Sequence, residues 1–305
     1  WTYSNGICDI VNWFGSPFGS YSSDFSVAVE DGAVYMAVVQ PEFKLAVAYL
    51  NRLYSEGLMD PEVITQSTAQ FQAKCKADPL IVGVTAVYHG GPELGLEIVE
   101  ANYVALPPLQ SDSGKAPIVR QQQNTVERGR AILFRTNPYP ELSMRWLDTL
   151  ASKENSFHGF FGYEGTHVIP LADGTFDPDP DRYTDRMQDI PVNTGGSLLL
   201  TPDVILKLNK VSGTDLLRKQ FYEVYESYVM PLSDTYPMVM FTEDQADRMV
   251  RAGKGELETY LQTTVAKWIT EGGIESEWDA YCAQVETLAA PILAIYQEAL
   301  DTYYG

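Results

Sequence analysis

The chain has 305 residues, of which 45% are hydrophobic and 20% are charged, so it is long enough for two lobes or one large domain. Its 41 acidic and 21 basic side chains give a net charge of −20, which repels nucleic acid and anionic membranes. No apolar stretch approaches the roughly 18–20 residues that cross a bilayer. We therefore expect no nucleic-acid partner and no membrane-spanning segment.

The first part of the chain predicts a hairpin, a helix and buried strands. Apolar residues alternate over 25–38 around Asp31-Gly32, a pattern typical of a β-hairpin. Pro41 is a good first helical residue, and the apolar stripe that follows it predicts a helix ending at Gly57. Apolar, β-branched runs predict further buried strands at 80–88, 103–106 and 131–134.

The second part of the chain is mainly helical. Pro140 begins a helix, whereas residues 159–197 hold many Gly, Pro and Asp and predict a long irregular excursion. Thr242 and Gln245 fit a capping box, and Gly272-Gly273 separates two long helices. Two shorter helices are expected at 202–206 and 216–229. Short strands among many helices predict an α/β fold with excess helix.

The sequence carries no strong signature of catalysis or of a cofactor. It contains no HExxH, GxSxG, GxGxxG, Walker or CxxC motif, and its three histidines show no metal spacing. The three cysteines are too few for a disulfide framework, although one disulfide with one free thiol is open: Cys8, Cys75 and Cys282. We therefore expect no enzyme, no cofactor and no metal.

An aspartate-rich stretch could collect a calcium ion, which takes about six to eight oxygen ligands. Its acidic residues are Asp173, Asp177, Asp179 and Asp181. The stretch lacks the Gly and Glu of an EF-hand loop, and the intervening prolines stiffen it. We therefore favour a reading without calcium.

Several segments, in order, resemble bacterial extracellular solute-binding proteins of the sugar and oligosaccharide type. YLNRLYSEGLMDPE at 49–62 resembles the family's helix and turn, and FGYEGTHV at 161–168 resembles its "yGiEGvHY" segment. The other matching stretches are 76–91, 103–115, 130–154 (RAILFRTNPYPELSMRWLDTLASKE), MVMFTEDQADRM at 238–249 and the tail 274–304. Each match alone is weak, but their common order is a strong signal.

The resemblance implies a periplasmic-binding-protein-like (type II) two-lobe fold with an incomplete first lobe, in a chain that lacks its amino-terminal part. Residues 1–125 would belong to the second lobe, 126–235 to the first lobe and the crossover, and 236–305 to carboxy-terminal helices that return to the second lobe. The implied function is binding of an extracellular solute, expected to be an oligosaccharide, for import by an ABC transporter. The partners would be ABC permease subunits, and the full-length form would be a lipoprotein on the outer face of the cell membrane.

In such proteins aromatic planes pack on the apolar faces of a sugar, and fixed polar groups satisfy its hydroxyls. The residues that we expect to contact the solute are Trp13, Phe14, Phe18, Tyr88, His89, Arg135, Tyr163 and Glu164. Structural roles stay open for all of them except Tyr163. The first three could anchor a loop in the core, Tyr88 and His89 could cap a strand, Arg135 could lie in a solvated linker, and Glu164 could hold a turn.

Two other functions stay open at this point. A secreted glycan-degrading enzyme would need two carboxylates about 5–10 Å apart in an aromatic cleft, and such a pair requires closeness in space rather than in sequence. A helical interaction domain would show an exposed apolar patch where the first lobe should pack.

Overall fold

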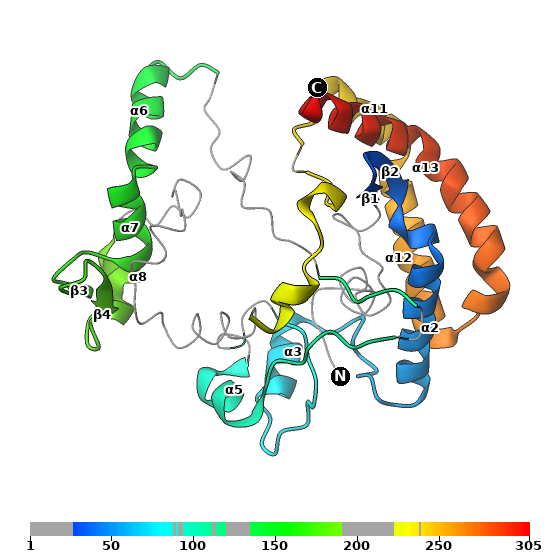
Figure 1. The fold of residues 1–305 in the computed structure, drawn as a ribbon, viewed down its shortest axis with the longest axis horizontal. Coiled ribbons are helices and arrows are strands. Elements are labelled where there is room, and N and C mark those ends of the chain that lie inside the picture. Colours follow the sequence, from blue (N-terminus) through cyan, green and yellow to red (C-terminus); the bar gives the residue numbers. More distant parts are fainter. Residues whose placement is uncertain are drawn as a thin grey trace. The chain divides into compact units, whose positions relative to one another are not determined.

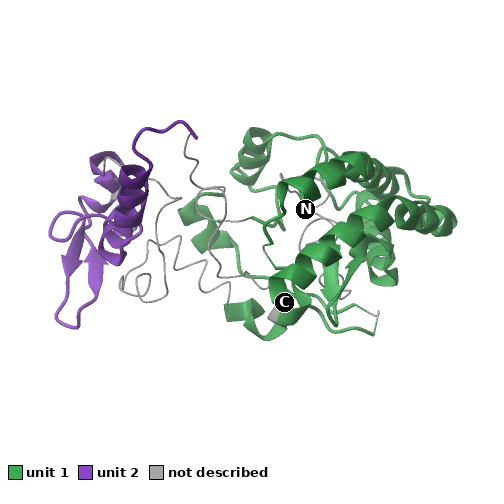
Figure 2. Cartoon of the chain, turned by 90° about the horizontal axis from the view of Figure 1, so that it is seen from above, with its two compact units in different colours: residues 1–124, 220–305 green, residues 125–219 purple. Residues whose placement is uncertain are grey.

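The computed structural model describes residues 27–87, 90, 94–111, 114–119, 135–190, 223–237 and 239–305. The chain divides into two compact units, Trp1–Asn124 with Gln220–Gly305 as unit 1, and Thr125–Lys219 as unit 2 (Figure 2). The assignment of 1–125, 126–235 and 236–305 to two lobes stays a prediction. None of the described helices is long and apolar enough to cross a membrane.

The predicted hairpin is present in unit 1. Strands β1 (Val27–Glu30) and β2 (Ala33–Met36) pair in antiparallel register. Asp31 and Gly32 connect them with positive φ angles of 49° and 78°, the backbone that a two-residue turn between right-twisted strands requires. Gln297 then ties this hairpin to the far end of the chain, because its amide accepts from the Val34 N–H at 2.8 Å and donates to the Gly32 carbonyl at 3.0 Å.

Three helices build the core of unit 1: α2 (Pro41–Ser55), α12 (Lys254–Glu271) and α13 (Ile274–Tyr304). Figure 1 shows α13 curving alongside α2 and α12. Each helix buries one apolar stripe, as its periodicity predicts, and residues such as Leu50, Leu261 and Val285 are fully buried in one continuous core. The Trp268 ring meets the Tyr281 ring edge to face at 4.7 Å.

The boundaries of these helices follow from local chemistry. Helix α11 (Glu243–Arg251) begins at the predicted capping box, in which Thr242 Oγ1 accepts from the Gln245 N–H at 3.2 Å and the Gln245 side chain accepts from the Thr242 N–H at 2.9 Å. Helix α12 ends at Gly272, and Gly273 begins α13; both glycines have positive φ angles. The capping box and the break between the two long helices are therefore confirmed.

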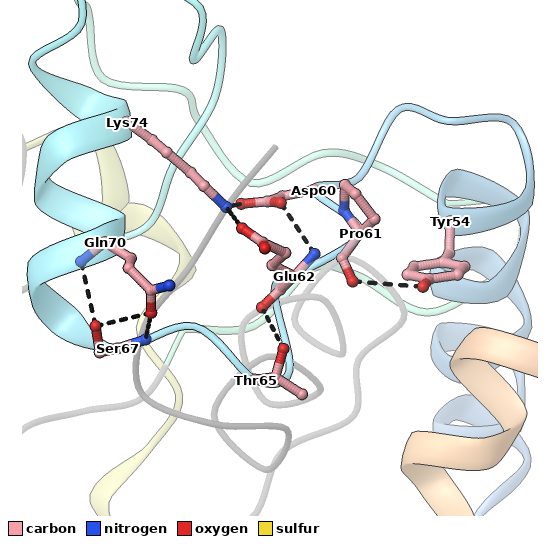
Figure 3. Close-up of polar contacts among 8 residues, drawn as sticks. All are labelled: Tyr54, Asp60, Pro61, Glu62, Thr65, Ser67, Gln70 and Lys74. Atoms are coloured by element: carbon pink, nitrogen blue, oxygen red, sulfur yellow. Dashed lines mark hydrogen bonds and ion pairs between the residues drawn. The ribbon is translucent and has the colours of Figure 1, made fainter.

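The 49–62 stretch continues from α2 into a turn that a lysine clamps (Figure 3). Asp60 Oδ1 accepts from the Glu62 N–H at 3.0 Å, and Lys74 Nζ lies 2.7 Å from both Asp60 Oδ2 and Glu62 Oε2. Burial lowers the pKa of Lys74, but its hydrogen bonds to the two carboxylates outweigh that effect and raise the pKa above its ordinary value. Lys74 comes from α3 (Thr68–Cys75), so this ion pair docks α3 on the turn.

Two of the predicted strands are wrong. Residues 80–84 and 103–106 lie outside the regular elements of the described chain, and Ile81 and Val84 are 67% and 46% exposed. A β-branched run forms a strand only where a neighbouring strand accepts its hydrogen bonds, and here the Tyr103 hydroxyl instead donates to the Val82 carbonyl at 2.6 Å. The predictions at 88, 131–134, 202–206 and 216–222 lie outside the described residues.

The remaining described elements of unit 1 are short. They are η2 (Ala37–Val39), α5 (Leu96–Asn102), η4 (Glu226–Tyr228) and η5 (Leu232–Asp234). Cys75 and Cys282 are free thiols, and burial raises the pKa of Cys75 to about 11, which makes it a poor nucleophile. The structure therefore excludes a disulfide between Cys75 and Cys282. Cys8 lies outside the described residues.

Unit 2 contains more regular structure than the sequence predicts. Helix α6 (Pro140–Leu150) begins at the expected proline, and α7 (Lys153–Phe161) follows it. The predicted irregular excursion holds a short antiparallel hairpin of β3 (Val168–Pro170) and β4 (Phe176–Pro178), then η3 (Tyr183–Asp185) and α8 (Arg186–Asp189). That prediction is therefore wrong over these residues. The buried side chains that hold them together are Phe157, Phe161, Val168, Phe176 and Tyr183.

Candidate functional site

The 162–167 loop of unit 2 connects α7 to β3 and carries two of the predicted site residues. Gly162 ends α7 with a φ of 96°, a conformation that favours glycine. A Cβ atom at this position would lie 2.4 Å from the Cβ of His167. Only glycine therefore allows the chain to leave the helix and pass this closely against His167.

Backbone hydrogen bonds close the loop on itself. The Tyr163 carbonyl accepts from the His167 N–H at 2.8 Å, and the Gly165 N–H donates to the Val168 carbonyl at 2.8 Å. The His167 carbonyl accepts in turn from the Asp179 N–H at 2.9 Å, which fixes the end of the loop to the residue that follows β4. Because these backbone groups are paired within the loop or with its immediate neighbours, the loop is a defined turn.

The buried imidazole of His167 holds the start of the loop in place. Its side chain has no exposed surface, and Nδ1 accepts from the Tyr163 N–H at 3.0 Å. Because an amide N–H can only donate, the ring proton sits on Nε2, which donates to Asp189 Oδ2 at 3.1 Å. Arg182 donates to the same carboxylate oxygen at 2.6 Å. The chain therefore supplies a partner for each ring nitrogen.

This support leaves a phenol ring and a carboxylate facing solvent. The Tyr163 ring lies with its centroid 5.3 Å from that of His158 and 5.8 Å from that of His167, and the residue is 39% exposed. Glu164 is the next residue and is also exposed. A fixed, partly exposed ring offers an apolar plane, and an adjacent carboxylate accepts hydrogen bonds from hydroxyl groups. The pair can therefore bind a ligand that has both an apolar face and hydroxyl groups.

The other predicted site residues are not brought to this loop by the described structure. Arg135 has an exposed side chain in the turn that precedes α6, and no hydrogen bond or ion pair among the described residues joins it to Tyr163 or Glu164. The rest lie outside the described residues: Trp13, Phe14, Phe18, Tyr88 and His89.

The sequence did not single out the residues that support the loop. His158 contributes a ring, and Asp189 and Arg182 fix the imidazole proton. Asp189 lies 22 residues after His167, and no spacing rule connects them. The only available signal was a histidine within the 161–168 segment that resembles the solute-binding family.

The aspartate-rich stretch uses its carboxylates to hold turns. Asp173 Oδ1 accepts from the Thr175 N–H at 3.0 Å, and Asp179 Oδ1 accepts from the N–H groups of Asp181 and Arg182 at 2.9 Å each. Across the part of the chain that the structure describes, no group of three or more His, Cys, Asp or Glu side chains is arranged to hold a metal ion.

Unit 1 carries an open groove between α11, α12 and α13, with a volume of about 1160 Å³. Its walls include the rings of Phe241, Tyr260 and Tyr296 and the paired side chains of Lys254 and Glu258. None of the residues that the sequence singled out for ligand binding lines this groove. The 162–167 loop is therefore the described place where predicted site residues meet.

Comparisons with known proteins point to one kind of protein. No protein-family model matches the chain. The fructooligosaccharide ABC transporter substrate-binding protein FusA of Streptococcus pneumoniae serotype 4 is 23% identical over 304 residues, covering 92% of this chain and 53% of FusA. The chain thus spans about half the length of this curated relative.

Solved structures of similar proteins match the fold over almost the whole chain. FusA in complex with kestose matches with a TM-score of 0.74 at 22% identity, over 96% of this chain and 60% of FusA. An HMO binding ABC-transporter associated solute-binding protein of Bifidobacterium longum infantis matches with a TM-score of 0.72 at 19% identity, over 99% of this chain and 62% of that protein. Alginate-binding protein AlgQ2 matches with a TM-score of 0.62 at 14% identity, over 98% of this chain and 63% of AlgQ2. The chain therefore has the periplasmic-binding-protein-like fold of ABC-transporter solute-binding proteins, as its resemblance to them predicted.

Proposed function

We propose that this chain captures an oligosaccharide outside the cell for import by an ABC transporter. The observation that carries the proposal is the match of nearly its whole length to FusA, which was solved in complex with kestose. The HMO binding neighbour supports the same class of solute. Kestose is therefore the first probe to test, because it is the sugar seen with the relative that also matches in sequence.

The 162–167 loop supports this proposal by its chemistry. A sugar ring presents apolar C–H faces and a rim of hydroxyls, which match a partly exposed tyrosine ring and a neighbouring carboxylate. We propose that Tyr163 packs on a sugar face and that Glu164 accepts from hydroxyl groups. The remaining predicted ligand residues stay part of the proposal on the strength of the family resemblance: Trp13, Phe14, Phe18, Tyr88, His89 and Arg135.

The proposed role is binding without chemical turnover. FusA and the HMO binding neighbour are both described as binding proteins of ABC transporters, which favours this role over the glycan-degrading alternative. The partners would be the permease subunits of an ABC transporter. In its full-length form, we expect the protein to be a lipoprotein on the outer face of the cell membrane.

Calorimetric titration of the chain with kestose tests the proposal. We expect the heat of binding to saturate and no hydrolysis products of kestose to form during prolonged incubation. Y163A should bind about tenfold more weakly, because it loses a ring contact worth about 1 kcal/mol. The matched control is Y139A, because Tyr139 is an exposed tyrosine of the same unit outside the loop. Equal affinities of the two variants would reject Tyr163 as a ligand residue, and hydrolysis of kestose would reject the binding role.

A helical interaction module is a second candidate, and one observation favours it. Helix α6 has no buried residue, and three of its apolar side chains are more than half exposed: Leu142, Met144 and Trp146. An exposed apolar face of this kind marks a contact with another protein surface. If L142E changes the sedimentation coefficient of the chain while kestose binding is absent from the wild type, the interaction module becomes the better assignment.

A further inference from the structure

His167 is the one described histidine with no exposed surface, and both of its ring nitrogens make hydrogen bonds. Nδ1 faces the Tyr163 N–H, and Nε2 faces the carboxylate of Asp189. An imidazolium carries a proton on each nitrogen. A second proton at Nδ1 would therefore turn this nitrogen from an acceptor into a donor. The Tyr163 N–H, which is also a donor, would then lose the hydrogen bond that holds the start of the loop.

The charged groups around His167 set the balance between its two forms. Asp189 of α8 favours a charged ring, but its Oδ2 already accepts from Arg182 at 2.6 Å, and Arg182 also lies 3.6 Å from Asp185. From α7 and the loop, His158 and Tyr163 present rings, and the backbone of Asp179 binds the His167 carbonyl. The carboxylate of Asp189 is thus shared between the His167 ring and the Arg182 guanidinium.

We propose that His167 is a positioning residue that presents Tyr163 and Glu164 to the solute only while its imidazole is neutral. The inference rests on the proposed function, because it assigns regulation to the same loop. Protonation breaks the bond from the Tyr163 N–H to Nδ1 and loosens the connection between α7 and β3. Solute binding therefore weakens once the imidazole takes up a second proton, which acidification favours for any histidine.

Two substitutions separate the acceptor at Nδ1 from the rest of the ring. Asparagine in H167N places an amide oxygen near the position of Nδ1, so it can accept from the Tyr163 N–H and cannot titrate. Glutamine in H167Q has a similar character but reaches the position of Nε2, which leaves the Tyr163 N–H without its acceptor. A merely structural role would make both variants similar, because both remove the imidazole from the same buried site.

Kestose titrations at about pH 7.5 and about pH 5.5 give the first test. We expect the affinity of the wild type to fall by about tenfold at the lower pH, the effect of losing one hydrogen bond. H167N should rescue binding to within about threefold of the wild type and show no such pH dependence, whereas H167Q should bind about tenfold more weakly at both pH values. A pH dependence in H167N equal to that of the wild type would overturn the proposal.

Amide hydrogen exchange in the unliganded wild type gives a second test that needs no variant and no sugar. The protection factor of the Tyr163 amide should fall between about pH 7.5 and about pH 5.5. The control is the Gly174 amide in the hairpin turn, which bonds to the Leu171 carbonyl at 3.1 Å and should keep its protection. Unchanged protection of Tyr163 would refute the role of His167, even if kestose binds.

The two tests also distinguish the failure of this inference from that of the proposed function. Absence of kestose binding at both pH values, together with loss of Tyr163 protection at low pH, would reject kestose as the solute and support the positioning role of His167. Kestose binding that does not change with pH, together with unchanged Tyr163 protection, would support the proposed function and reject the positioning role of His167.

Discussion

Trp268 of unit 1 and Tyr163 of unit 2 lie in opposite surroundings. Unit 1 buries Trp268 completely between α12 and α13, in a continuous core that long helices build from regular apolar stripes. The described residues of unit 2 form a core cluster of five side chains, and unit 2 holds Tyr163 at the surface through a turn and a buried histidine. The first arrangement stabilises the fold, and the second keeps the Tyr163 ring partly exposed. The contrast shows that a buried side chain can either fill an apolar core or fix a neighbouring ring at the surface.

The comparison also explains where polar groups are placed. In unit 1, side chains such as Gln297 and Lys74 join elements that are distant or separate along the chain, and they lie at the edge of an apolar core. In unit 2, His167 lies inside, where an unpaired polar group would be costly, and all of its hydrogen-bonding capacity is used. A buried polar network of this kind specifies one loop conformation.

The largest expected effect comes from deleting the buried ring of unit 1. W268A should lower the free energy of unfolding by about 3–5 kcal/mol, because it removes apolar burial and leaves a cavity. The matched control is W146A in α6 of unit 2, where the tryptophan is 52% exposed and the change should stay within about 0.5 kcal/mol. Urea unfolding measures both, and similar losses in the two variants would break the contrast between the units.

The next largest effect is expected at the start of the loop in unit 2. G162A should cost about 1–3 kcal/mol from backbone strain alone, and more because the new Cβ would overlap His167. G165A is the control, since Gly165 also has a positive φ but no atom lies within 4 Å of its Cβ position. Thermal unfolding of the two variants isolates the contact with His167, and G165A should be the more stable one. The reverse order would mean that the loop does not pack on the histidine.

A smaller loss is expected where Gln297 joins the hairpin to α13. Q297A removes the two hydrogen bonds to the hairpin and a third to Asp301 of its own helix. It should reduce the free energy of unfolding by about 1 kcal/mol, since all three bonds are at least partly open to solvent. Q284A, on an exposed position of the same helix, is the control. Urea unfolding of the pair checks the expectation. No difference between them would show that the hairpin does not depend on α13.

The smallest effect is a pH dependence at the edge of the unit 1 core. Hydrogen bonds from Lys267 and then Trp268 lower the pKa of Glu277, so its contribution is present above the ordinary pKa of a glutamate and is lost as the pH falls through the lowered value. The melting temperature of E277Q should therefore fall less on acidification than that of the wild type. E286Q, exposed on the same helix, should follow the wild type. Parallel curves for all three proteins would contradict the role of Glu277.

Local pattern predicted the parts of the fold that depend on neighbours in sequence. The Asp31-Gly32 turn, the start of α2 at Pro41 and the capping box at Thr242 all appear where the sequence placed them, because each is decided within about four residues. The apolar run at 80–84 had the composition of a strand, but a strand also needs a partner, and the structure gives it none within the described residues.

The candidate site divides along the same line. Tyr163 and Glu164 were predicted because the segment that contains them resembles a family, and Gly162 marks the turn in the sequence itself. Their support was not predicted. Asp189 reaches His167 from 22 residues away, and its carboxylate accepts from both His167 and Arg182 only because folding brings α8 next to the loop.

The sequence by itself therefore determined helices α2, α12 and α13, the capping box at Thr242, the first hairpin and the likeness to solute-binding proteins, since periodicity and turn chemistry act over a few residues. The tertiary structure decided which apolar runs became strands, which ring nitrogen of His167 carries the proton, and how far the Tyr163 ring is exposed. Those properties depend on hydrogen-bond partners that only folding brings within about 3 Å of each other.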